Sequence, residues 1–216
     1  MKDTMSKIHL ELLDEKRKEV LHILKSFNGY GFLTGGTALA LQINHRKSVD
    51  FDIFVSKEIN NHLRKKAKDV FGSTQIHVDN GDQLTFSTPD HIEITFLWYY
   101  YKALKPTIKT SSISLSSVAD ILADKAHTIG RRAVWRDYVD IFYVIHEKIT
   151  TLPNIVISAE RKFGSDFSSV LFLQQLAYFD DFEASPVDFT NKDYSPDYIK
   201  KFLSDETEKY TLNALK

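Results

Sequence analysis

Two aspartates, Asp50 and Asp52, open a run of apolar residues at positions 53–55. Side chains alternate along a strand, so both carboxylates would point to one face, about 7 Å apart at the backbone, with Phe51 pointing into a core. Two like charges on one strand face repel each other unless a cation lies between them. Carboxylate oxygens are hard ligands that suit Mg²⁺ or Mn²⁺. The pattern therefore predicts a divalent metal site at Asp50 and Asp52.

A glycine pair, Gly35 and Gly36, follows a short apolar run and precedes Thr37 and further good helix formers. This order predicts a strand, a tight turn and the start of a helix. Backbone amides at a helix N-terminus bind anions, and glycine lets a phosphate come close. Thr37 is placed to cap the helix or to contact a phosphate. A phosphate site beside a two-carboxylate metal site would bind a nucleotide through Mg²⁺.

The glycine turn and the two aspartates together are a more specific signal than either feature alone. Gly35–Thr37, a short helix and then Asp50–Asp52 resemble the signature of the polymerase-beta-like nucleotidyltransferase superfamily. The fuller string, which adds His45, Arg46, Ser48 and Phe54, resembles the AbiEii/AbiGii toxin family within it. Those proteins are toxins of abortive-infection and related toxin–antitoxin systems.

The resemblance covers roughly residues 30–145 and implies nucleotidyl transfer, in which a hydroxyl attacks the α-phosphate of a nucleoside triphosphate and pyrophosphate leaves. It implies an α+β fold, with a polymerase-beta-like core around a mixed sheet and a helical C-terminal part. Gly35, Gly36 and Thr37 would hold the β and γ phosphates. The implied partners are the triphosphate, an RNA acceptor such as a tRNA 3′ end, and a cognate antitoxin.

The predicted strand at residues 91–96 carries Glu93 among apolar residues. In the family a third carboxylate lies on a strand of this type, so the resemblance implies that Glu93 is a metal ligand or general base. The alternative is an exposed strand residue. Arg46 and Ser48 could contact phosphate, although Arg46 could equally be a surface charge. His45 is expected to be structural.

Lys125 falls inside the apolar stripe of a helix expected from Ser117 to Ile129, while Asp124 and His127 fall toward solvent. A buried ammonium group is costly unless it snorkels out or meets an anion. Lys125 is therefore either a snorkelling side chain or a contact to the triphosphate or the carboxylates.

The family also places a lysine-bearing helix before an Arg/Lys-Asp-x-x-Asp helix, which Arg136, Asp137 and Asp140 match. Asp137 would orient Lys125 or an arginine and so belongs to the predicted nucleotide site. Arg136 and Asp140 could instead form an ordinary surface pair. The roles of Arg131, Arg136 and Asp140 stay open.

The remaining pattern is an α/β part at residues 1–112 followed by a helical part at 113–216. Helices are predicted at 6–27, 60–71, 117–129, 135–148, 153–164, 166–179 and 196–213, and strands at 75–79, 84–87 and 91–96. Asn80 and Gly81 mark a hairpin. The 60–71 helix carries four bases, Arg64, Lys65, Lys66 and Lys68, which form either a solvated face or a nucleic-acid or phosphate contact.

Composition narrows the alternatives. The chain has 216 residues, no cysteine and a formal net charge of −1, which excludes disulfides and thiolate metal sites and gives no overall attraction to nucleic acid. No apolar run reaches the length of a membrane span, and we expect a cytoplasmic protein without membrane contact.

Glycosyltransferases and haloacid-dehalogenase phosphatases also use Asp-x-Asp, but the glycine turn and Phe54 fit neither. A non-catalytic nucleotide-binding or partner-binding module stays open.

Overall fold

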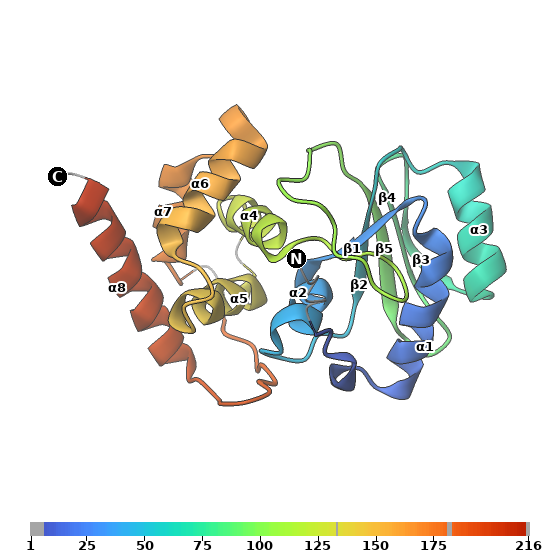
Figure 1. Cartoon of the computed structure of the whole chain (residues 1–216), viewed down its shortest axis with the longest axis horizontal. Coiled ribbons are helices and arrows are strands. Elements are labelled where there is room, and N and C mark those ends of the chain that lie inside the picture. Colours follow the sequence, from blue (N-terminus) through green and yellow to red (C-terminus); the bar gives the residue numbers. More distant parts are fainter. Residues whose placement is uncertain (1–6, 133, 181–182, 215–216) are drawn as a thin grey trace, which may run out of the picture. The chain divides into compact units, whose positions relative to one another are not determined.

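The computed structural model describes residues 7–132, 134–180 and 183–214. Strands and helices alternate in the first half of the chain, and helices follow in the second (Figure 1). In chain order the elements are η1 (Leu10–Leu12), α1 (Glu15–Leu24), η2 (Lys25–Phe27), β1 (Gly31–Thr34), α2 (Gly35–Ile43), β2 (Phe51–Val55), α3 (Asn61–Phe71), β3 (Gln75–Asp79), β4 (Gln83–Ser87), β5 (Glu93–Trp98), α4 (Val118–Ile129), α5 (Trp135–His146), α6 (Leu152–Phe163), η3 (Gly164–Asp166), α7 (Ser169–Leu176) and α8 (Pro196–Ala214).

The chain forms two compact units, which are described separately. The first contains the residues up to Tyr100 together with Pro106–Ser117, and the second contains Tyr101–Lys105 and Val118–Lys216. The strands all lie in the first unit and α4 to α8 in the second. The fold is therefore α+β, as predicted.

The first unit is built on a five-stranded sheet in the order β1-β2-β5-β4-β3. β2 and β5 are parallel, and the other neighbouring strands are antiparallel, so the sheet is mixed. The aromatic side chains of Phe27, Phe71, Phe86 and Phe96 contact one another and fill one face of this sheet. This face is the hydrophobic core, and α3 covers part of it.

The N-terminal helix is shorter than predicted. Instead of one helix over 6–27, α1 begins at Glu15, because Asp14 has an extended backbone and its side chain accepts a hydrogen bond from the backbone N–H of Arg17. Arg17 reaches back to the Asp14 carboxylate and donates from Nε to the carbonyl of Val49 at 3.1 Å. The N-cap at Asp14 therefore starts the helix later than the helical periodicity of the sequence predicts.

The hairpin at Asn80 is confirmed, since the Asn80 side chain accepts from the backbone N–H groups of Asp82 and Gln83 at 2.8 Å. The next strand, predicted from His91, begins at Glu93, because His91 has a positive φ of 59° that a strand does not accommodate. The sequence pattern finds both elements but misplaces the second boundary.

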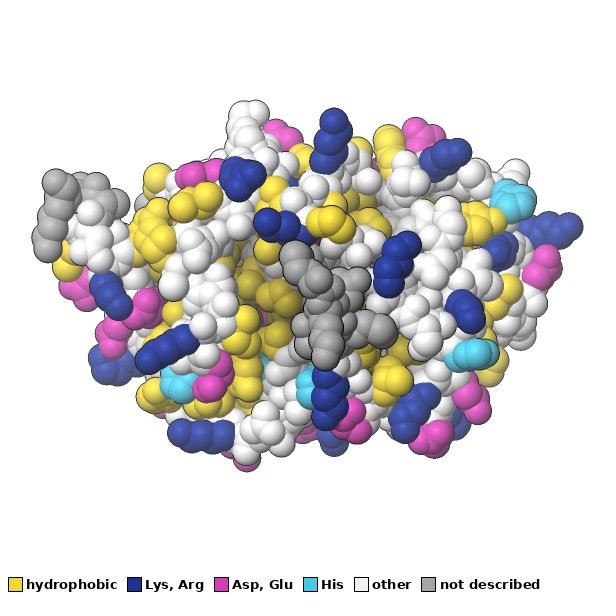
Figure 2. Space-filling model, in the orientation of Figure 1, with side chains coloured by type: hydrophobic (Ala, Val, Ile, Leu, Met, Phe, Trp, Pro, Cys, Tyr) yellow, Lys and Arg dark blue, Asp and Glu magenta, His cyan; other side chains and the backbone are white. Residues whose placement is uncertain are grey.

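The second unit is helical, and side chains cap the N-termini of some of its helices. Thr151 and Ser168 accept hydrogen bonds from backbone N–H groups in the first turns of α6 and α7. None of the helices described is both long and apolar enough to cross a membrane. Charged side chains of both signs are interspersed on the face seen in Figure 2, in keeping with the net charge of −1.

Candidate active site

The glycine turn joins a strand directly to a helix. β1 ends at Thr34 and α2 begins at Gly35, whose φ is +68°. A Cβ atom on Gly35 would lie 2.5 Å from Oδ2 of Asp52, so only glycine fits both the backbone conformation and the space. The carboxylate of Asp52 therefore lies against the first residue of α2. This contact joins the two halves of the predicted nucleotide site.

Gly36 makes room for a second group. A Cβ atom there would lie 2.8 Å from Nη2 of Arg46 and 3.0 Å from Oγ of Ser48. Arg46 is 2% exposed, so it is not the surface charge that the sequence left open. The guanidinium and the N-terminal end of the α2 dipole both carry positive potential, which attracts an anion.

Thr37 does not cap α2, because the N-cap residue is Thr34 and Thr37 lies within the first turn. Its hydroxyl contacts Oγ of Ser48 at 3.0 Å and the carbonyl oxygen of Asp50. The side chain is 1% exposed, and it ties the helix to the segment that leads into β2. Its backbone amide belongs to the first turn of α2, where helix amides have no partner within the helix.

The aspartate strand has the predicted alternation. Phe51 and Ile53 on β2 are fully buried, while Asp52 is half-buried and lies on the opposite face. Asp52 pairs with Thr34 on β1 and with Thr95 on β5. The parallel register brings the acid-bearing ends of β2 and β5 to the same end of the sheet.

Glu93 is exposed and begins β5. Phe51, the first residue of β2, pairs with Ile94, so extending the register by one residue would bring Asp50, which precedes the strand, level with Glu93. Asp52 and Glu93 lie near the same end of the sheet, and Asp50 lies just before it. Within the residues that the structure describes, no three His, Cys, Asp or Glu side chains are close enough to form a metal site. The backbone aligns these acids, but their carboxylates do not converge.

The donor set nevertheless fits a hard divalent cation. Asp50, Asp52 and Glu93 supply carboxylate oxygens, which Mg²⁺ and Mn²⁺ prefer. Asp52 already lies in the space that a Cβ of Gly35 would fill, beside the helix N-terminus suited to phosphate.

In the second unit, Lys125 is buried on α4 and does not snorkel. Its Nζ lies 2.6 Å from Oδ1 of Asp137 and 2.7 Å from Oδ2 of Asp140, both on α5. Of the alternatives left open for Asp140, the structure favours the contact with Lys125 over a surface pair with Arg136, because Asp140 is fully buried and Arg136 is exposed. The cost of burying the ammonium group is offset by two carboxylates.

A second lysine, not predicted to be buried, lies in the interior of the helical unit. Lys162 on α6 is 2% exposed at its side chain, and its Nζ lies 3.1 Å from Asp120 and 2.7 Å from Asp124. Asp124 was expected to face solvent, as was His127, which stacks on Phe163 at 4.0 Å. Burial and the nearby Arg131 lower the pKa of His127. The burial of Lys162 could have been predicted from the sequence, because this lysine lies on the apolar stripe of its helix.

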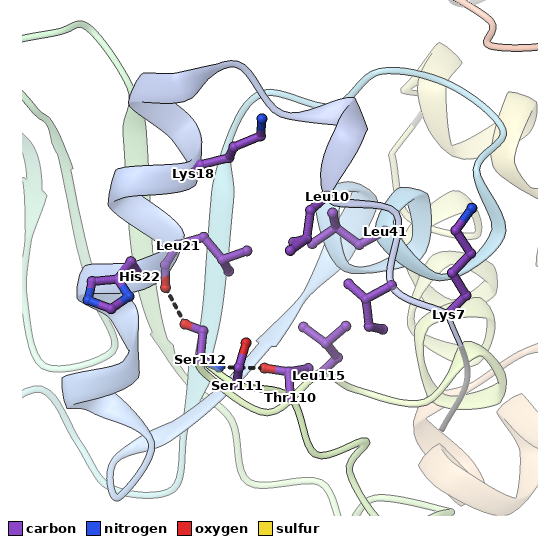
Figure 3. Close-up of a pocket in the computed structure, with 11 residues that line it drawn as sticks. Lys7, Leu10, Lys18, Leu21, His22, Leu41, Thr110, Ser111, Ser112 and Leu115 are labelled. Atoms are coloured by element: carbon purple, nitrogen blue, oxygen red, sulfur yellow. Dashed lines mark hydrogen bonds between the residues drawn. The ribbon is translucent and has the colours of Figure 1, made fainter. Parts of the chain in front are cut away.

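A cavity of about 470 Å³ in the first unit does not contain the predicted catalytic residues. It lies between α1, the segment at residues 7–10 and the loop at 110–112, and Leu10, Leu21 and Leu41 point into it (Figure 3). A site chosen by cavity volume alone would therefore not have included the carboxylates. The chemistry of the glycine turn and of β2 identifies the candidate site instead.

Comparison with known proteins identifies the family of the chain. Residues 25–213 match the family described as "Nucleotidyl transferase AbiEii toxin, Type IV TA system". An uncharacterized protein of Aquifex aeolicus, aq_aa25, is 27% identical over 155 residues, which is 69% of this chain and 74% of that protein.

Two solved structures share the fold. MenT4, a nucleotidyltransferase toxin of Mycobacterium tuberculosis, has a TM-score of 0.60 and 16% identity, with 91% of this chain and 82% of that chain covered. JHP933 from Helicobacter pylori has a TM-score of 0.55 and 16% identity, with 94% and 99% covered. At this identity the likeness concerns the fold alone.

Proposed function

The chain belongs to the AbiEii family of nucleotidyltransferase toxins, and from this premise we propose that it moves a nucleoside monophosphate from a nucleoside triphosphate to an acceptor hydroxyl. We propose RNA, for example the 3′ end of a tRNA, as the acceptor. The observation that carries the proposal is the contact between Gly35 and the Asp52 carboxylate, which joins a phosphate-binding turn to an acidic strand.

The phosphates bind at the N-terminus of α2. Backbone amides of Gly35, Gly36 and Thr37 donate hydrogen bonds to the β and γ phosphates. Arg46, buried beside Gly36, neutralises part of the phosphate charge, and Ser48 supports it from the same side. The arrangement holds the leaving pyrophosphate in place while the α-phosphate faces β2.

Asp50, Asp52 and Glu93 act at the reacting end of the triphosphate. They would hold Mg²⁺ or Mn²⁺, which when bound neutralises phosphate charge and lowers the pKa of a bound hydroxyl. Glu93, exposed at the start of β5, accepts the proton of the acceptor hydroxyl. The acceptor oxygen then forms a bond to the α-phosphorus, and the bond to pyrophosphate breaks.

Lys125 is proposed as a further triphosphate contact, with Asp137 as the residue that orients it. The ion pair between them at 2.6 Å supports a charged, fixed ammonium group. We also propose that the protein acts in the cytoplasm, where triphosphates and RNA are found, and that a cognate antitoxin counteracts it.

Incubation with each α-labelled nucleoside triphosphate, Mg²⁺ and total RNA tests the proposal. We expect label in RNA with wild-type protein and with the surface control Asp82→Asn, and its loss with Asp50→Asn and Asp52→Asn. Each substitution removes a ligand charge while nearly preserving shape. Glu93→Gln should retain triphosphate binding by calorimetry but slow transfer by about tenfold or more.

Folded Asp52→Asn protein that labels RNA at the wild-type rate would refute the catalytic assignment. Triphosphate binding with no transfer to any RNA, protein or small-molecule acceptor would favour the alternative of a non-catalytic nucleotide-binding module.

A further inference from the structure

The two edges of the sheet differ. At β1 the backbone N–H of Leu33 donates to the carbonyl of Ser114 at 2.9 Å, and the N–H of Ser116 donates to the carbonyl of Leu33 at 2.8 Å, so the segment around 114–116 covers that edge. At the other edge, β3 pairs with β4 alone, and no segment of the described chain adds to its outer side. An uncovered strand edge can accept another strand.

A groove runs beside this open edge, between α3 and the β3–β4 hairpin (both labelled in Figure 1). Its volume is about 460 Å³, and its apolar lining includes Ile76, Leu84 and Phe86. Ile76 pairs with Phe86 across the hairpin, yet it is 59% exposed. The groove therefore presents an apolar side chain to solvent next to an open backbone edge.

The rim of the groove is basic. Lys65 and Lys68 on α3 line it, and within the described chain neither forms an ion pair. Asp79 also lines it, but Nε of Arg64 lies 2.7 Å from this carboxylate and balances its charge. A net positive potential therefore borders the edge strand.

We propose that β3 is a docking edge for an extended acidic peptide segment of a protein partner. The segment adds to β3 through backbone hydrogen bonds, places an apolar side chain against Ile76, and sets its carboxylates beside Lys65 and Lys68. Residues i and i+2 of an added strand face the same side, so an apolar residue and an acid two positions away can both face the groove that Ile76, Lys65 and Lys68 line. The register of β3 shifts between Ile76 and Val78, so the added strand pairs with β3 on one side of this irregularity. The proposal does not depend on the catalytic assignment.

Other occupants fit less well. A second copy pairing antiparallel through β3 would put both α3 helices on one face, with the lysines of each copy toward those of the other. Single-stranded RNA would meet the lysines but would leave the apolar lining and the backbone edge unused. Charge and hydrogen bonding together favour an acidic strand.

The test uses the full-length protein and a short fluorescein-labelled peptide that repeats valine, threonine, glutamate and threonine, so that valine and glutamate share one face of the strand. We expect saturable binding by anisotropy and new hydrogen-exchange protection of the amides of 75–79. Lys65→Glu combined with Lys68→Glu should weaken binding about tenfold or more, as should Ile76→Lys. Lys25→Glu combined with Lys57→Glu, which makes the same charge change elsewhere in the first unit, should leave it unchanged.

The same peptide with lysine in place of glutamate and the acidic peptide interrupted by proline should both fail to bind. The proposal is overturned if the acidic peptide does not bind, if its binding is indifferent to Lys65, Lys68 and Ile76, or if 75–79 gains no protection. Tighter binding of oligouridine through the same lysines would assign the groove to nucleic acid, and a dimer lost in Ile76→Lys would assign it to a second copy.

Discussion

At the scale of single residues, Gly35 and Asp52 constrain each other. Gly35 holds a left-handed backbone conformation that costs other residues about 1–2 kcal/mol. The same residue leaves space for the Asp52 carboxylate. Strain and steric exclusion are therefore separate reasons for glycine at this position, and substitutions can separate them.

We expect Gly35→Ala to fold but to lose about tenfold or more of its transfer activity, because a Cβ would push Asp52 away from its position. Stability should fall by about 1–2 kcal/mol from backbone strain. Thermal denaturation followed by circular dichroism gives the stability, and label transfer to RNA gives the activity.

Gly72→Ala is the matched control, since Gly72 has a φ of +71° but nothing within 4 Å of an added Cβ. It should show a similar loss of stability with normal activity. Equal activities in the Gly35 and Gly72 variants would show that the contact with Asp52 has no catalytic importance.

At the scale of elements, α4 is fixed by two buried ion clusters. Lys125 on α4 pairs with carboxylates on α5, and Asp120 and Asp124 on α4 pair with Lys162 on α6. Removing one partner from such a cluster leaves buried charges without compensation. The clusters therefore specify how these three helices pack.

Lys125→Met should destabilise the protein by about 3–5 kcal/mol, because Asp137 and Asp140 would then lack their ammonium partner. The snorkelling alternative would have left stability unchanged or raised it. Urea denaturation measures the difference. Lys201→Met, which breaks an exposed pair with Asp205, should change stability by less than about 1 kcal/mol.

Combining Lys125→Met with Asp137→Asn and Asp140→Asn removes the uncompensated charges and should recover part of the stability. If Lys125 contacts the triphosphate, this variant will still bind nucleotide about tenfold more weakly or worse than wild type. Normal binding and turnover by the triple variant would restrict Lys125 to helix packing.

Alkaline pH should weaken the attachment of the segment before α8. Burial, together with the hydrogen bond that Tyr194 donates to Glu147 at 3.0 Å, raises the pKa of Tyr194 to about 12. An unfolded tyrosine ionises near pH 10, so the unfolded chain loses this proton first. The stabilisation is complete below about pH 10 and is lost as the pH rises toward 12.

We therefore expect the free energy of unfolding to fall more steeply between pH 10 and 12 in wild type than in Tyr194→Phe. Denaturant titrations at a series of pH values give this difference, in which the contributions of other tyrosines cancel. Parallel pH profiles for the two proteins would contradict the prediction.

The elements were largely predictable because their signals are local. The Asn80 turn and the alternation around Asp52 depend on a few neighbouring residues. Contacts between side chains of different elements could not be predicted from the sequence. The pairing of Asp140 with Lys125 and the approach of Arg46 to Gly36 depend on how separate segments pack. The boundary at Asp14 was missed because a single cap outweighed helical periodicity.

At the scale of the whole molecule, the family predicts toxicity. Inducible expression in a bacterial host should arrest growth. On the proposed role of Asp52 in transfer, Asp52→Asn should relieve the arrest at equal protein levels. Growth curves with immunoblots measure both quantities. Arrest that persists with the folded mutant would point to binding or aggregation as the cause.

The path of the chain limits how freely its two halves could be exchanged between relatives. The helical unit includes Tyr101–Lys105, a short excursion from within the sequence of the first unit. There the buried Asp120 carboxylate accepts the backbone N–H groups of Leu104 and Lys105 at 2.8 and 3.1 Å. A graft cut at Val118 would leave those five residues behind and remove two backbone N–H groups that donate to the buried Asp120 carboxylate. We therefore expect recombination between relatives to exchange Tyr101–Lys105 together with the helices that follow Val118.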